Sequence, residues 1–97
     1  MEEKKPIDIQ IQVDEQTMLG KYSTMAQVTH MAEEFWLDFF AIVPNLQIAR
    51  LLARIIVSPP HAKRLAQALA DNVRKYEANF GVIDEAKTAV PNIGFKQ

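Results

Sequence analysis

The sequence predicts an α+β protein in the order β-β-β-β-α: a four-stranded antiparallel sheet with one long C-terminal helix on one face. Apolar residues recur every second position in the first part of the chain and every third or fourth position near its end. The chain has 97 residues, of which 48% are hydrophobic and 24% charged. This size and composition fit one small domain, which we place at residues 1–83, followed by a flexible tail at 84–97.

The first two strands are predicted at residues 7–13 and 22–30. In the first, the apolar residues Ile7, Ile9, Ile11 and Val13 alternate with Asp8, Gln10 and Gln12. The stretch "QTMLGKY" breaks this pattern, and its Gly20 can take the positive φ of a turn. The second strand places alternate residues on one face: Tyr22, Thr24, Ala26, Val28 and His30.

The third and fourth strands, "EFWLDFFAIV" and "IARLLARIIV", are apolar on both faces, which indicates that both faces are covered. Paired as an antiparallel hairpin across "PNLQ", they form one uncharged face, made of Phe35, Leu37, Phe39, Leu51, Ile55 and Val57. The opposite face holds Trp36, Asp38, Phe40, Ile42, Arg50, Leu52, Arg54 and Ile56. One allowed register sets Asp38 opposite Arg54, where the two can form an ion pair.

A helix is predicted from Ser58 to Gly81. Ser58 suits the N-cap and Pro59 the first helical position, and Gly81 suits the residue that follows the last turn. One apolar stripe runs along the helix and comprises Ala62, Leu65, Ala66, Leu69, Val73, Tyr76 and Phe80. We expect this stripe to lie on the uncharged face of the sheet.

One helix covers only one face of the sheet, so the face around Trp36 needs a second cover. A two-fold symmetric partner is the simplest one, because the same patch then serves both chains. We therefore predict a homodimer whose interface is built from Trp36, Asp38, Phe40, Leu52, Arg54 and Ile56. The alternative is that the C-terminal tail folds back over this face.

Charge is unevenly distributed although the net charge is only −1. Residues 1–49 hold eight acids against three lysines, a net of −5, and residues 50–97 hold eight bases against four acids, a net of +4. This asymmetry indicates either an acidic partner or attraction between parts of one assembly. The candidate contacts for an anion or a nucleic acid are Arg50, Arg54, His61, Lys63 and Arg64.

The stretch "SPPHAKRL" at residues 58–65 is the centre of that candidate site. A helix N-terminus binds anions through free backbone N–H groups, but Pro59 and Pro60 lack them and Ser58 can cap the N–H of His61. Lys63 and Arg64 lie where the helix dipole disfavours positive charge. Glu33, Glu34, an acid of a partner chain or a nucleic-acid phosphate could offset that cost.

No catalytic, metal or cofactor site is predicted. The histidines, His30 and His61, have no carboxylate at motif spacing, and the three glycines form no phosphate-binding loop. The chain has no cysteine, no apolar run of about 20 residues and no signal-peptide core in "MEEKKPIDIQ". We therefore expect a cytoplasmic protein that is not an enzyme and has no membrane contact.

Several segments resemble a prokaryotic family known as domain of unknown function 3467: "GKY", "EFWLDFFAIVP", "RIIVSPPHAKRLAQAL" and "YEANFG". The resemblance spans about Gly20 to Ile83, and Ser-Pro-x-His-Ala-Lys-Arg-Leu is its most specific part. Where family members show Tyr-Ala-Asn after the glycine and lysine, this chain has Tyr22, Ser23 and Thr24. The resemblance implies no activity and no catalytic residues.

These observations favour a homodimer of uncharacterised function with a structural or protein-interaction role. The alternative is a single-stranded DNA or RNA binder, because β4α units that dimerise are similar to Pur-type and whirly-like proteins. In that interpretation Trp36 and Phe40 stack bases while Arg50 and Arg54 neutralise phosphates. The acidic first half and a pI near 6.1 argue against it.

Overall fold

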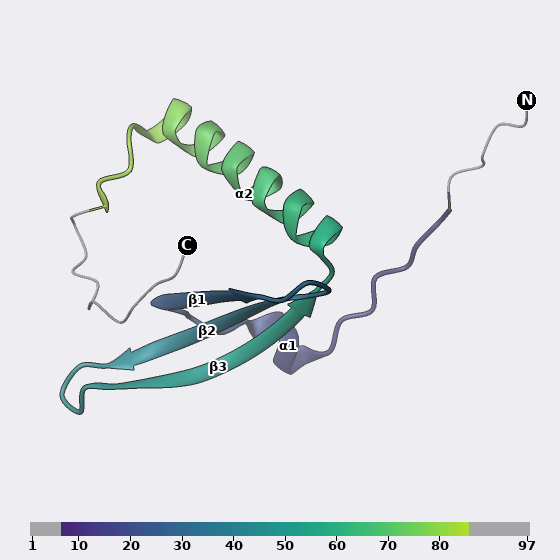
Figure 1. Ribbon diagram of the computed structural model, residues 1–97. Helices are drawn as coiled ribbons and strands as arrows, with labels where there is room; N and C mark the ends of the chain where they lie inside the picture. The colour runs from purple at the N-terminus through teal and green to yellow at the C-terminus, as the bar shows by residue number, and fades with distance from the viewer. Residues whose placement is uncertain (1–6, 86–97) are drawn as a thin grey trace, which may run out of the picture.

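The computed structural model describes residues 7–85, which form three strands and two helices. The elements follow the order α1 (Glu15–Leu19), β1 (Met25–His30), β2 (Phe35–Val43), β3 (Ile48–Val57) and α2 (Pro59–Phe80) (Figure 1). The antiparallel sheet has the strand order β1-β2-β3. The α+β class is confirmed, but the prediction of four strands is wrong, because residues 7–13 do not join the sheet. The predicted tail lies almost wholly outside the described residues.

The register of β2 and β3 defines the two faces of the sheet. Asp38 pairs with Arg54, which confirms the register expected from their charges. The apolar face carries Val28, Phe35, Leu37, Phe39, Ala53, Ile55 and Val57, and the charged face carries Trp36, Asp38, Phe40, Leu51, Arg54 and Ile56.

A β-bulge shifts this register between Phe39 and Phe40, where Leu52 is the extra residue on β3. Beyond the bulge Arg50 pairs with Ala41 and Leu51 with Phe40. Because neighbouring residues of a strand point to opposite faces, the shift moves Arg50 onto the apolar face and Leu51 onto the charged one. The prediction that Arg50 shares a face with Trp36 and Arg54 is therefore wrong.

A short helix, α1, precedes the sheet in the stretch predicted to be a turn. Asp14 caps α1 by accepting a hydrogen bond from the Thr17 N–H, and Gly20 follows the helix with φ at 76°. The next strand begins at Met25 rather than Tyr22. Ser23 donates its hydroxyl to the carbonyls of Met25 and Phe40, while Thr24 Oγ1 accepts from the Ile42 N–H. These side-chain bonds supplement the backbone bond from the Thr24 N–H to the Phe40 carbonyl and attach this segment to β2 before β1 begins.

Helix α2 has the predicted ends. Ser58 Oγ accepts from the His61 N–H at 3.3 Å, Pro59 opens the helix, and Gly81 follows it with φ at 93°. The expectation that α2 lies on the sheet is wrong: the helix rises from the end of β3 at a steep angle (Figure 1). Among the described hydrophobic residues, only Met25 and Val57 are buried. Residues 7–85 of a single chain therefore form almost no hydrophobic core.

Candidate interaction surfaces

Asp38 is the centre of the charged face and, at 5% exposure, its most buried polar residue. The Arg54 guanidinium donates two hydrogen bonds to the carboxylate, from Nε to Oδ1 at 2.8 Å and from Nη2 to Oδ2 at 3.1 Å. The same guanidinium lies over the Trp36 ring, with 4.1 Å between its carbon and the ring centroid. The three residues form one bidentate ion pair with a cation–π contact.

This arrangement alters both ionisable groups. The hydrogen bonds from Arg54 hold the pKa of Asp38 below its ordinary value, although desolvation opposes them. The same hydrogen bonds raise the pKa of Arg54. Asp38 is therefore an ionised partner of Arg54 at neutral pH. A general acid needs the opposite, a carboxyl group with an elevated pKa.

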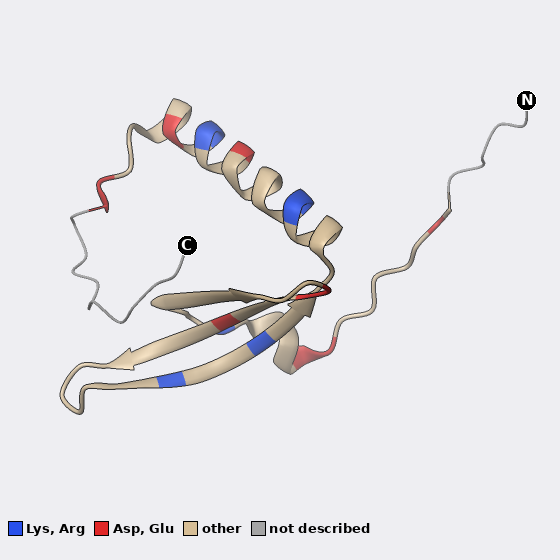
Figure 2. Cartoon of the chain, in the orientation of Figure 1, with Lys and Arg blue, Asp and Glu red and all other residues tan. Residues whose placement is uncertain are grey.

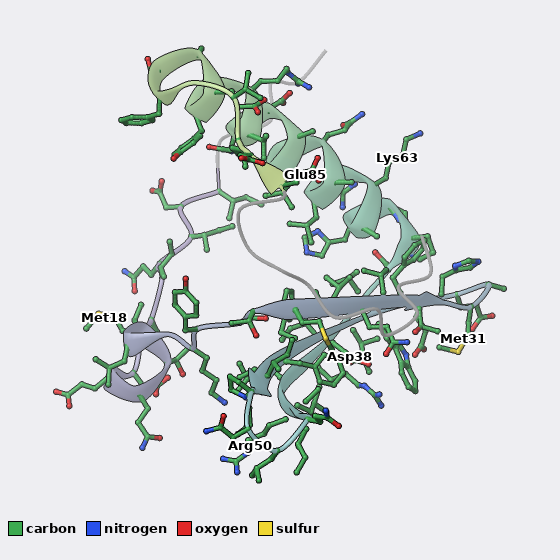
Figure 3. The ribbon with its side chains drawn as sticks, turned by 90° about the vertical axis from the view of Figure 1, so that its left-hand side faces the viewer. Met18, Met31, Asp38, Arg50, Lys63 and Glu85 are labelled. Atoms are coloured by element: carbon green, nitrogen blue, oxygen red, sulfur yellow. The ribbon has the colours of Figure 1, made fainter. Side chains whose placement is uncertain are left out.

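The remaining predicted interface residues lie around this cluster. Trp36 Nε1 donates to the Glu34 carboxylate, and Lys21 Nζ donates to the Leu52 carbonyl that the bulge exposes. Phe40 is half-buried, and 54% of Ile56 is exposed. In Figure 3 Asp38 lies among the side chains below β1, and α2 lies above β1. Asp38, Arg54, Trp36 and Lys21 are thus already partnered within the chain. The role of this face as a subunit interface stays a prediction.

The apolar stripe of α2 has no such partners. Leu65 is 41% exposed, Leu69 64%, Val73 37%, Tyr76 50% and Phe80 74%. The rings of Tyr76 and Phe80 contact only each other among aromatic groups of the described chain, with centroids 5.0 Å apart. On the sheet, Val28 and Ile55 of the apolar face are 43% and 50% exposed. An amphipathic helix and an apolar sheet face both remain open to solvent.

The basic candidates do not form one site. Arg54 is engaged by Asp38, whereas Arg50 lies on the opposite face near the far end of β3. Lys63 points away from the sheet (Figure 3), and within residues 7–85 neither it nor Arg64 forms an ion pair, so Glu33 and Glu34 do not neutralise them. His61 is exposed, and only its backbone N–H is bonded to Ser58. The basic residues of β3 and α2 are separated along both elements (Figure 2).

Between residues 7 and 85, no three histidine or carboxylate side chains converge in a way that could hold a metal ion. Neither α1 nor α2 combines the length and the apolar character that crossing a bilayer requires.

Sequence reasoning located the Asp38–Arg54 pair but missed two features. The first is the contact between Arg54 and Trp36, which depends on side-chain rotamers. The second is α1, whose ends could have been recognised from Asp14 as an N-cap followed by the acidic Glu15, and from Gly20 after the last turn.

The fold and these surfaces define a class of small α+β protein in which an antiparallel sheet leads directly into a long amphipathic helix. A family described as "Protein of unknown function (DUF3467)" matches residues 1–85. The chain belongs to this family, as the resemblance of its central segments indicated. No curated protein and no solved structure matches the chain.

Proposed function

We propose that this protein acts as a cytoplasmic homodimer with a structural or protein-interaction role and without catalysis. The observation that carries the proposal is the open apolar stripe of α2, from Leu65 to Phe80. An amphipathic helix is stabilised in water mainly by burial of its apolar face, and residues 7–85 of its own chain leave the apolar face of α2 largely exposed. A partner surface is required, and a second copy supplies one.

The apolar face of the sheet is the surface that matches the stripe. Val57 ends β3 on this face and leads through Ser58 into α2, so the helix starts beside the face and then diverges from it (Figure 1). A second copy related by a two-fold axis places its helix over the first sheet and receives the first helix in return. Both open surfaces are then covered by one symmetric contact.

The charged face supports a non-catalytic role. Its most buried carboxylate, Asp38, is bonded to Arg54 at both oxygens, and its tryptophan is covered by the same guanidinium. Such a cluster stabilises the hairpin of β2 and β3 and leaves no acid or base poised for proton transfer. In this proposal the cluster holds β2 and β3 together in the sheet on which the partner helix packs.

Substitution on the helix stripe tests the proposal. In Leu69→Lys a charge enters the centre of the proposed contact, whereas Gln67→Lys introduces the same charge on α2 outside the stripe. Burying one leucine contributes about 1.5–3 kcal/mol and a two-fold contact counts it twice, so we expect dissociation to rise by roughly a hundredfold or more. Sedimentation equilibrium should find Leu69→Lys monomeric and Gln67→Lys dimeric. A monomeric wild-type protein would refute the proposal.

Single-stranded nucleic acid remains the alternative ligand, with Lys63 and Arg64 as its exposed cations. Trp36 is poorly placed to stack on a base, because the Arg54 guanidinium already covers its ring. Arg54 is poorly placed to bind a phosphate, because Asp38 already neutralises it. We expect the Trp36 fluorescence of the wild-type protein to stay unchanged when single-stranded oligonucleotides are added at low salt. A saturable, salt-sensitive change would establish the alternative instead.

A further inference from the structure

The N-terminal arm, residues 7–13, has the residue pattern of a strand but no strand partner. Its three isoleucines are among the most exposed of the large hydrophobic residues described, with Ile7 at 83%, Ile9 at 80% and Ile11 at 86%, and Val13 is 56% exposed. Within residues 7–85 its backbone makes no hydrogen bond to the sheet. Strict alternation of isoleucine with polar residues is typical of a strand with one buried face, so this arm is incomplete as it stands.

The arm is directed away from its own sheet. Asp14 caps α1 immediately after the arm, and Gly20 ends α1 with positive φ. Lys21 then bonds to Leu52 on β3, the edge strand opposite β1. The arm therefore starts from the β3 side and extends outward beyond the sheet (Figure 1). To pair with β1 of its own chain, it would have to reverse direction and cross the sheet.

The two edges of the sheet differ in how well they are protected. Edge strands avoid pairing with other chains through charges, bulges and covering groups. β3 has all three: two arginines, the bulge at Leu52, and Lys21 on the Leu52 carbonyl. β1, with the sequence "MAQVTH", contains no lysine, arginine, acid or proline. Within residues 7–85 it pairs regularly along its length with β2 and with no other strand. The free edge of β1 is thus the open pairing site.

The arm and β1 also match in polarity. On β1, Ala26 and Val28 belong to the apolar face, and Gln27 and Thr29 to the charged face. A strand added there with its isoleucines beside Ala26 and Val28 sets Gln10 and Gln12 beside Gln27 and Thr29. A slip of one residue would reverse every side chain, so only half of the registers keep both faces consistent.

We propose that the N-terminal arm of one copy adds as a fourth strand to the free edge of β1 in a second copy. This inference rests on the proposed homodimer and names a contact within it. The exchange completes the four-stranded sheet that the sequence pattern predicts, with the extra strand supplied by the partner. It also extends the apolar face over which the partner helix packs.

Disulfide trapping between two variants tests the exchange directly, because the protein contains no cysteine of its own. The variants Ile7→Cys, Ile9→Cys and Ile11→Cys are each mixed in equal amounts with Val28→Cys and oxidised. Each chain then has one thiol, so a disulfide between the two variants can form only between chains. Gln10→Cys mixed with Val28→Cys is the matched control, with its thiol on the opposite face of the added strand.

We expect at least one isoleucine-derived variant to form the mixed disulfide rapidly and the Gln10→Cys control to form little. Sedimentation of the reduced proteins is measured alongside. Reduced proteins that are dimeric but give no mixed disulfide would overturn the exchange and leave the homodimer intact. Wild-type protein that is monomeric would overturn the homodimer itself, and the exchange with it.

Discussion

The charged face of the sheet and the apolar stripe of α2 differ in where their partners lie. On the charged face, Arg54 donates hydrogen bonds to both carboxylate oxygens of Asp38 and covers the Trp36 ring. The ion pair and the cation–π contact therefore both form within one hairpin. On α2, Leu69 and Phe80 remain 64% and 74% exposed. The polar contacts of this chain thus form between neighbouring strands, whereas burial of its hydrophobic stripe requires a surface outside the described chain.

Two adjacent residues of β3 offer the sharpest test of this difference. Ile55 and Ile56 are 50% and 54% exposed, but Ile55 lies on the apolar face and Ile56 on the charged face. If the partner helix covers the apolar face, Ile55→Lys should raise the dimer dissociation constant by roughly a hundredfold or more, because two isoleucines lose their burial. Sedimentation equilibrium measures both variants.

Ile56→Lys is the matched control and should weaken the dimer far less. The opposite order would move the interface to the Trp36 face, as the sequence analysis predicted. This pair of variants therefore decides between the two faces without depending on the absolute stability of either variant.

A smaller effect, on the stability of the folded chain, is expected from substitution of Ser58 at the junction between β3 and α2. Ser58→Ala removes the acceptor for the His61 N–H, which should lower the free energy of unfolding by about 1 kcal/mol. Ser58→Asp retains a capping oxygen and should unfold at nearly the wild-type denaturant concentration. Chemical denaturation followed by circular dichroism measures both variants. Equal stability of Ser58→Ala and wild type would mean that the cap contributes nothing.

The smallest effect on stability should come from removing the ion pair between Asp38 and Arg54. The Arg54 side chain is 43% exposed, so solvent screens the interaction. The pKa of Asp38 is lower in the folded protein than in the unfolded chain, so its stabilising contribution is complete above the unfolded value of about 3.9. That contribution is lost as the pH falls through the lower, folded pKa.

Asp38→Asn should therefore differ most from wild type near neutral pH and converge with it in acid. Asp14 also has a lowered pKa, caused by its hydrogen bonds to Thr17, and it provides the same acid dependence in both proteins. Urea denaturation at several pH values measures the difference. If the difference in stability between Asp38→Asn and wild type grew as the pH fell, the lowered pKa of Asp38 would be contradicted.

Local features of this fold could be predicted from the sequence. Strands β2 and β3 follow from two apolar runs on either side of the turn "PNLQ". The start of α2 follows from Ser58 with Pro59, and its end from Gly81. The Asp38–Arg54 pair follows from opposite charges at matching positions. These features depend on residues close in the sequence or on the pairing within one hairpin. There the spacing of apolar residues and the length of the turn restrict the possible strand and helix positions.

The features that could not be predicted depend on longer-range placement. The bulge at Leu52 changes the face of Arg50 without any change in apolar pattern, because both faces of β3 are largely apolar. The arm at 7–13 and the stripe of α2 have correct periods for buried elements. A period shows that a face needs covering but does not show which chain covers it.

The central claim is that the open surfaces of one chain are closed by a second copy. Light scattering on the wild-type protein over a dilution series from high to low micromolar concentration tests it most directly. We predict a mass twice the 11.0 kDa of the chain across the upper part of that range, falling only on dilution. A constant mass of 11.0 kDa at every concentration would contradict the account.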